Sequence, residues 1–240
     1  MHTIRSLACS ALAFLMPGLP AMASPIATED FTAYDPASPW AAPTDAWSYV
    51  TGNTWSLVAG VDGNKMLRSS ANPREGFGSA GQIYYRLDGL TNQPNRIVFD
   101  MQIPESGTVP AGGSATVIIG FSRTRELGST PEGAFAITFP QEIDSQGLAK
   151  LGVSSIRVEP GGNTADNPIQ AATVASMFDV TMPFRVEVEV DPSAETVRAR
   201  VNGEPWSETV RLPFSWNEVK YFRIYQRLLQ VDVKKIEFFE

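Results

Sequence analysis

The sequence has few of the histidine and cysteine residues that many enzyme active sites use. Its 240 residues include one histidine, His2, and one cysteine, Cys9, both close to the amino terminus. Basic residues are outnumbered as well: 19 Lys and Arg stand against 26 Asp and Glu, which gives a net charge of −7. Since a phosphate backbone is bound by a basic face, this balance argues against nucleic acid as a partner.

The first 23 residues have the pattern of a secretory signal peptide. Arg5 supplies a positive start, residues 7–16 form an apolar run, and Ala21-Met22-Ala23 fits the small-x-small cleavage motif. The run is too short for a permanent membrane span, and no second one follows. We therefore expect cleavage after Ala23 and export by the general secretory route, to the periplasm or the medium, without membrane insertion.

Cleavage at this point would remove both His2 and Cys9 and leave a mature chain of 240 − 23 = 217 residues. Without a thiol no disulfide can form. Without an imidazole, Ser-His-Asp and Cys-His catalysis are excluded, and so is zinc held by histidine or cysteine. Carboxylates, tyrosine, lysine and arginine remain, which argues against most catalytic chemistry.

Alternation of apolar and polar residues with period two dominates the rest of the chain. At most a short helical turn is expected, at 169–178. Many short strands separated by Gly, Pro, Asn and Asp predict an all-β sandwich or barrel. No repeat or linker divides residues 24–240, so we expect one domain there. The alternating segments are 83–90, 96–103, 115–124, 133–139, 154–159, 184–190, 196–203, 221–229 and 231–239.

One hairpin can be predicted residue by residue, within 184–201. Apolar residues alternate there with Arg and Glu before the turn and with two arginines after it. Pairing position 190 with 197 places Glu189 opposite Arg198 and Glu187 opposite Arg200, and such pairs stabilise a sheet by about 0.2–1 kcal/mol. We interpret the two glutamates as a charge-paired surface rather than as a glycosidase pair.

A family resemblance rests on three stretches of sequence. They are EDFTAYDPASPW with TWSLVAGVDGNKMLRSS near the start, FRVEVEVDPSAETVRARVNGEPW, and the ending YFRIYQRLLQVDVKKIEFF. Together they cover most of residues 29–240 and resemble the secreted concanavalin A-like (laminin G-like) jelly rolls. The resemblance implies a two-sheet antiparallel β-sandwich and is strongest to members without catalysis.

Residues 138–147, TFPQEIDSQG, resemble the catalytic motif of family 16 glycoside hydrolases, which share this fold. The motif is Glu-x-Asp-x-Glu, sometimes with one inserted residue; its first Glu is the nucleophile and its last the acid/base. Glu142 and Asp144 match, but the last position holds Gln146, or Gly147 with the insertion. Because a retaining mechanism needs two carboxyl groups about 5 Å apart, we expect no hydrolysis here. The flanking Pro and DSQG predict a hairpin turn instead.

The segment YFRIYQ, residues 221–226, resembles the last catalytic strand of alginate lyase-type polysaccharide lyases. The resemblance places Tyr225 at the position of the catalytic tyrosine. Their middle strand carries Gln-x-His, where this chain has Phe121 and Arg123, so the histidine is missing. Tyr225 acting with Arg123 and Arg223 on an acidic glycan therefore remains an alternative.

The same strand also predicts a binding face, because tyrosine and arginine alternate along it. Tyrosine rings stack on the C–H faces of sugars, and guanidinium groups grip carboxylates or pairs of hydroxyls. The mature chain favours such contacts, with 13 Arg and 5 Lys. The alternative is an ordinary outward face whose arginines pair with Asp100 or Glu159. The predicted ligand-binding residues are Tyr221, Arg223, Tyr225, Arg227, Arg86, Arg123 and Arg157.

Two smaller features complete the prediction. The five tryptophans lie in loop-like contexts, and we expect burial under connections rather than sugar platforms: Trp40, Trp47, Trp55, Trp206 and Trp216. Asp62 and Asn64 in VDGNK resemble a calcium-binding loop, although a plain turn is the simpler interpretation.

The sequence thus predicts a secreted, lectin-like β-sandwich that binds a neutral or acidic glycan without hydrolysing it. No cofactor is expected beyond the hypothetical structural calcium. The alternatives are the acidic-polysaccharide lyase and a structural or adhesive protein of the cell envelope.

Overall fold

The fold is almost entirely β-strand. A computed structural model describes residues 23–34, 46–51, 55–60, 63–69, 80–106, 116–123, 134–138, 141–143, 149–159, 170–212, 214–227 and 229–240. Within them the single helical element is a 3₁₀ turn, η1 (Trp216–Glu218). No helix in these ranges is long and apolar enough to cross a membrane.

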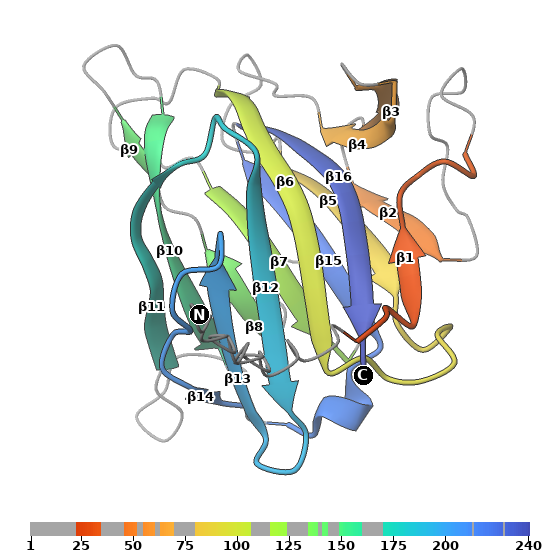
Figure 1. Cartoon of the computed structure of the whole chain (residues 1–240), viewed down its shortest axis with the longest axis vertical. Coiled ribbons are helices and arrows are strands. Elements are labelled where there is room, and N and C mark those ends of the chain that lie inside the picture. Colours follow the sequence, from red (N-terminus) through yellow and green to blue (C-terminus); the bar gives the residue numbers. More distant parts are fainter. Residues whose placement is uncertain are drawn as a thin grey trace, which may run out of the picture.

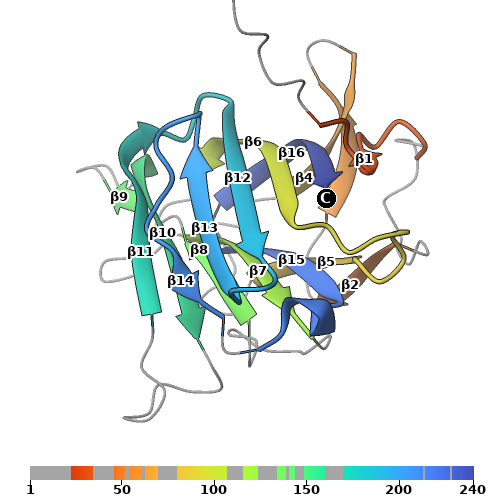
Figure 2. The ribbon, with the colours of Figure 1, turned by 60° about the horizontal axis from the view of Figure 1, so that its bottom comes forward.

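The described strands form two antiparallel sheets that pack face to face (Figure 1; Figure 2). The sheet nearer the viewer in Figure 1 is called the front sheet. Its order is β14-β13-β12-β6-β16-β4-β3, and β1 pairs with β16. The strands are β1 (Ala27–Glu29), β3 (Trp55–Ala59), β4 (Lys65–Ser69), β6 (Arg96–Ser106), β12 (Phe184–Asp191), β13 (Thr196–Val201), β14 (Val210–Arg211) and β16 (Leu229–Phe239).

The second sheet, called the back sheet, has the order β11-β10-β8-β7-β15-β5-β2, and β9 pairs with β10. Figure 2 shows β7, β15 and β5 in a separate layer, below β12, β6 and β16 in that view. The strands are β2 (Trp47–Thr51), β5 (Ala80–Arg86), β7 (Thr116–Ser122), β8 (Ala134–Thr138), β9 (Gln141–Ile143), β10 (Ala149–Glu159), β11 (Gln170–Asp179) and β15 (Tyr221–Arg227). The expected two-sheet antiparallel β-sandwich is confirmed.

The core lies between the sheets and follows from strand alternation, since every second side chain of a strand points to the same face. One row across the back sheet consists of isoleucines, paired strand to strand at Ile83, Ile224, Ile119, Ile137 and Ile156. The first three of these side chains are fully buried.

Aromatic rings connect the two sheets. The ring of Tyr85 stacks on Phe222 of its own sheet at 5.1 Å and on Phe238 of the front sheet at 5.2 Å. Burial, and then the nearby Glu29 carboxylate, raise the pKa of Tyr85 to about 12. Glu29 also accepts hydrogen bonds from Trp47 Nε1 (3.0 Å) and the backbone N–H of Phe31 (2.9 Å), which ties β1 to both sheets.

The predicted hairpin register is confirmed in β12 and β13, where Glu187 pairs with Arg200 and Glu189 with Arg198. Arg200 donates two hydrogen bonds to Glu187, at 2.9 and 3.0 Å, and Arg96 of β6 donates a third at 2.8 Å. Arg198 donates to Glu189 at 2.9 Å. The predicted charge pairs are therefore confirmed, but only Glu189 lies on a solvated surface, since Glu187 is 5% exposed.

The expected helical turn at 169–178 is wrong, because these residues belong to β11, the edge strand of the back sheet. Ala172 and Val174 are buried there and contribute to the core. Local alanine content favours a helix, but pairing with β10 along most of its length decides the conformation.

Candidate functional site

The candidate site is built around β15, which lies between β5 and β7 in the middle of the back sheet. Phe222 and Ile224 point into the core and are fully buried. Alternation therefore places Tyr221, Arg223 and Tyr225 on the opposite side, called the outer face. The predicted face of alternating tyrosine and arginine therefore lies on a strand that has a neighbouring strand on each side.

Strand register sets a row of residues across the outer face through Arg223. Tyr84 and Gly120 flank Arg223, and Ala136 and Arg157 continue the row beyond Gly120. Three strand spacings separate the backbones of the two arginines, which is about 14 Å. Because the two positions between them are glycine and alanine, the row has little side-chain bulk at its centre.

The next row along the strands passes through Tyr225 and is rich in polar residue types. Gln82 and Ile118 flank Tyr225, and Thr138 and Ser155 follow on β8 and β10. Hydroxyl and amide groups are the partners that sugar hydroxyls require. The two rows together combine two tyrosines, two arginines and further hydroxyl residue types within a few strand spacings.

Burial differs sharply along this face. Arg223 is 1% exposed and Tyr84 is completely buried, whereas Tyr221 and Tyr225 are half-buried. The rings of Tyr84 and Tyr221 meet edge to face, with centroids 6.4 Å apart. An arginine side chain keeps its positive charge in proteins, so Arg223 contributes positive potential from beneath the surface. Tyr221 and Tyr225 are therefore the part of the site that a ligand can reach.

Two other predicted arginines lie at one end of the face and have local partners. Arg86 pairs with Asp88 at 2.6 Å, and both side chains are well exposed. Arg123 pairs with Glu218 at 2.9 Å and lies 5.5 Å from the ring centre of Phe214. The predicted alternative partner of such arginines, Asp100, lies instead on the front sheet.

Two predicted residues can be placed by backbone position alone. Arg227 pairs with Ala80 and Thr116 at the end of β15. Arg157 pairs with Ala136 and Ala171. Both positions belong to the back sheet, but they are three strand spacings apart across the sheet and about 13 Å apart along the strands, because Arg157 lies in the row of Arg223.

The three residues of the lyase hypothesis do not meet at one centre. Tyr225 pairs with Ile118, and Arg123 lies five residues further along the chain, about 16 Å at the rise of a β-strand. Arg223 lies on the same face of β15 as Tyr225, two residues before it, but its side chain is buried. A tyrosine base with two arginines around one uronate is therefore not assembled by these residues.

The hydrolase-like motif lies away from the candidate site. Glu142 lies on β9, where it pairs with Leu151 of β10. Ser155, in the row of Tyr225, is four residues from Leu151, or about 13 Å along the strand. β9 and β10 are antiparallel neighbours, as the predicted hairpin requires, while Asp144 and Gln146 lie outside the described residues.

The tryptophans follow the burial prediction where they are described, with one exception. Trp47, Trp55 and Trp216 are at most 2% exposed. Trp206 is half-buried, and the guanidinium groups of Arg198 and Arg200 lie 4.7 and 4.5 Å from its ring centre. Trp40 lies outside the described residues.

The calcium hypothesis rests on Asp62, which lies outside the described residues, and on Asn64, which is exposed. The backbone oxygen of Asn64 accepts a hydrogen bond from Gly60 N–H at 2.6 Å, which closes a turn. Gly63 in that turn has φ of +79°, a conformation that glycine adopts without strain. Among the described residues no group of three or more Asp, Glu, His or Cys could hold a metal.

Sequence reasoning missed Tyr84 and Gly120, which flank Arg223 on either side. The signal for Tyr84 was present, because it alternates with Arg86 in IYYRLDGL. The signal for Gly120 was not, since only the pairing of β7 with β15 reveals which residue leaves space beside Arg223.

Comparison with known proteins gives similarity in structure rather than in sequence. No protein-family model matches the sequence, and no curated protein does. A family 16 glycoside hydrolase from Bacteroides ovatus, solved with a mixed-linkage glucan product, superposes with a TM-score of 0.55 at 10% identity, covering 88% of this chain and 98% of that one. LamAcat from Zobellia galactanivorans has a TM-score of 0.55 at 8% identity, covering 90% and 98%. Peanut lectin has a TM-score of 0.51 at 12% identity, covering 88% and 96%. At these identities the likeness is one of fold.

Proposed function

We propose that this chain, which folds as a concanavalin A-like jelly roll, binds a carbohydrate on the outer face of its back sheet and does not hydrolyse it. The observation that carries the proposal is the placement of Tyr221, Arg223 and Tyr225 on the outer face of the central strand. The solved structures with this fold include a lectin and a glucan-bound glycoside hydrolase, which supports a glycan ligand for this chain.

The chemistry of the face suits a sugar. Half-buried tyrosine rings offer flat apolar surface for the C–H face of a pyranose, and their hydroxyls remain available as hydrogen-bond partners. Beneath them, the buried charge of Arg223 favours electron-rich groups such as ring hydroxyls or a carboxylate. In the row of Arg223, Tyr84 and Gly120 are buried as well, so a sugar is expected to contact the face through Tyr221 and Tyr225.

The absence of hydrolysis follows from the motif that resembles the family 16 enzymes. Gln146 stands where those enzymes have their acid/base carboxyl group, and an amide cannot donate and recover a proton as a carboxyl does. Glu142 also lies about 13 Å along the strand direction from the row of Tyr225. A retaining pair about 5 Å apart therefore has no counterpart at the proposed site.

Export fits the same function. The leader-like residues 1–23 support secretion to the periplasm or the medium, where polysaccharides of the envelope or the surroundings are the available ligands.

A panel experiment tests the proposal. The purified protein is screened against neutral and uronate-rich polysaccharides, with calcium added or chelated, while reducing ends and unsaturated products are followed in the same samples. We expect saturable binding without new reducing ends or ultraviolet-absorbing products. New reducing ends would show a hydrolase, and unsaturated products would show the lyase. A folded protein that binds no glycan but captures an envelope protein would support the structural alternative.

A further inference from the structure

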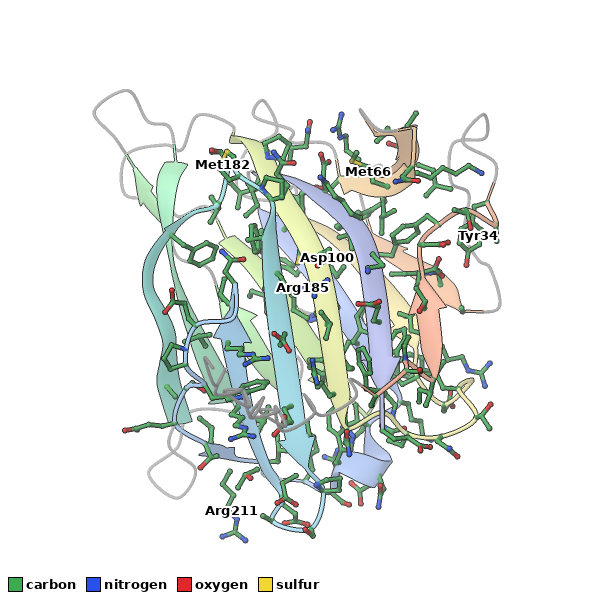
Figure 3. All side chains as sticks on the ribbon, viewed as in Figure 1. Tyr34, Met66, Asp100, Met182, Arg185 and Arg211 are labelled. Carbon is green, nitrogen blue, oxygen red and sulfur yellow. The ribbon has the colours of Figure 1, made fainter. Side chains whose placement is uncertain are left out.

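A cavity lies on the outer face of the front sheet, on the opposite side of the molecule from Tyr225. Its volume is about 590 Å³, within the range of roughly 300–1,000 Å³ typical of small-molecule sites. Strands β6, β12 and β16 form its base, and β4 and the segment after β1 form its wall. Figure 3 shows Asp100 and Arg185 side by side on this face, with Met66 above them.

Part of the lining is apolar. Met66, which is 8% exposed and lies outside the core cluster, lines the cavity together with Pro183, whereas the side chains of Phe184 and Met101 belong to the core between the sheets. A site that joins apolar surface to a few polar groups suits an organic ligand with a C–H face better than a bare inorganic ion.

The charged part of the lining depends on a β-bulge in β16. Val233 pairs with Met101 and Lys235 with Asp100, so Lys234 is an extra residue between them. The buried residues of β16 change from odd to even numbers at this point, from Val231 and Val233 to Ile236 and Phe238. A bulge of this kind redirects side chains, and here it brings two consecutive lysines to one cavity.

The cavity is positive in an acidic protein. It is lined by four cationic and two anionic residues, although acidic residues outnumber basic ones in the whole chain, 26 to 19. The cations are Lys65, Arg185, Lys234 and Lys235, and the anions are Asp30 and Asp100. Glu237, just outside the lining, lies 3.1 Å from Lys235 and 3.9 Å from Arg185, so the local excess is one positive charge. This excess has the opposite sign to the net charge of the chain and favours an anionic ligand.

Several of these charges already have partners. Asp100 accepts hydrogen bonds from Arg185 at 2.8 and 3.1 Å, and Lys235 lies 3.6 Å from the same carboxylate. Hydrogen bonding to Asp100 raises the pKa of Arg185. Lys65 donates to the backbone oxygen of Thr32 at 3.0 Å, which positions the ammonium without neutralising it.

Lys234 is the cation left for a ligand. It is half-buried, and within the described ranges neither a hydrogen bond nor an ion pair engages its ammonium group. Across the cavity, Asn202 accepts a hydrogen bond from the backbone N–H of Arg185 through its Oδ1, at 2.8 Å. Its side-chain amide nitrogen is thereby directed away from that bond and can donate to a ligand.

We propose that this cavity is a second ligand site, distinct from the face of Tyr225, and that it binds a hexuronate sugar, free or as the end of an acidic glycan. The carboxylate of the uronate contacts Lys234, the hydroxyls meet the amide of Asn202 and the carboxylate of Asp30, and the C–H face packs on Met66 and Pro183. The inference uses none of the residues of the proposed glycan face, so either site can fail without the other.

The test is a titration of the ¹⁵N-labelled protein with galacturonate and glucuronate, followed by amide chemical shifts. Glucose and inorganic phosphate serve as comparison ligands, one without charge and the other without a C–H face. We expect saturable shifts at Arg185, Asn202, Lys234 and Lys235 with either uronate, and much weaker shifts with both comparison ligands.

Matched lysine variants make the test specific. Lys234→Gln removes the charge and should weaken uronate binding by about fivefold or more, which corresponds to roughly 1 kcal/mol. Lys234→Arg keeps the charge and should retain binding, and Lys220→Gln, at an exposed lysine outside the cavity, should change nothing. Because Lys234 is half-buried on a surface bulge, its variants should keep the spectrum of the folded protein.

Three outcomes would overturn the inference. Equal binding of glucose would exclude recognition of the carboxylate, and equal binding of phosphate would exclude recognition of the sugar. Unchanged uronate affinity in Lys234→Gln, or shifts confined to residues 221–225, would remove the site from this cavity.

Discussion

The charge-paired surface of the front sheet gives a sharp prediction, because it holds two glutamates that differ in burial and in the number of arginines that pair with them. Glu187 is 5% exposed and accepts three hydrogen bonds from Arg96 and Arg200. The Glu189 side chain is 32% exposed and is paired with Arg198, whose side chain is 39% exposed. The two residues lie on the same strand and face, so the same substitution at each is a matched comparison.

We expect Glu187→Gln to lower the free energy of unfolding by about 2 kcal/mol, because it removes charge-assisted hydrogen bonds from a buried acceptor. The value stays below that of a fully buried ion pair because the side chains of Arg96 and Arg200 are 35% and 28% exposed and can regain water. Glu189→Gln should cost less than about 1 kcal/mol, as exposed pairs do.

Urea unfolding followed by tryptophan fluorescence measures both variants. With a slope of about 2 kcal/mol per molar urea, Glu187→Gln should lower the midpoint by about 1 M, and Glu189→Gln by less than half of that. Equal shifts in the two variants, or an unchanged midpoint for Glu187→Gln, would refute the claim that burial decides the strength of these pairs.

Two further predictions concern stability: one rests on the positive φ of Gly203 and the other on the raised pKa of Tyr85. Gly203 has φ of +75°, and a Cβ added there would meet open space, so Gly203→Ala should lower the free energy of unfolding by about 1 kcal/mol from backbone conformation alone. Gly89, where φ is not positive, is the control, and Gly89→Ala should be near neutral in the same urea assay. Tyr85 has its pKa raised to about 12 from an ordinary 10, so its neutral form is favoured by folding and its contribution is lost as the pH rises from 10 through 12. Tyr85→Phe, which keeps the stacked ring, should flatten this alkaline loss of stability, and an alkaline limb identical to that of the parent protein would contradict the assignment.

Strand alternation explains why much of the fold could be predicted from the sequence. In residues 184–201 apolar residues alternate with charged ones, so one face of the hairpin is apolar and the other carries opposite charges. Pairing these charges across the strands predicts the register, which the structure confirms. The same rule failed at 170–179, where small residues carry little alternation and pairing with β10 determines the strand. The bulge at Lys234 was visible as two consecutive lysines, but the cavity beneath it depends on β4 and on the segment after β1.

The candidate site was predictable only in part, for a similar reason. Alternation assigns Tyr221, Arg223 and Tyr225 to one face, but it does not reveal that Arg223 is buried while the tyrosines are not. Nor does it reveal that β5 and β7 flank β15, because these pairings join residues more than 90 positions apart in the sequence. Arg123 was grouped with Tyr225 by motif, and the strand register separates them.

The central claim is that a glycan binds to the outer face of the back sheet, and paired aromatic variants test it most directly. Tyr225→Ala is compared with Trp206→Ala, which removes a half-buried aromatic ring from the front sheet. Titration calorimetry with the glycan that binds the parent protein should show about tenfold weaker binding for Tyr225→Ala, as expected for the loss of a ring contact of about 1.4 kcal/mol, and unchanged binding for Trp206→Ala. Unchanged affinity in Tyr225→Ala, with the protein folded, would contradict the account and move the glycan site off this face.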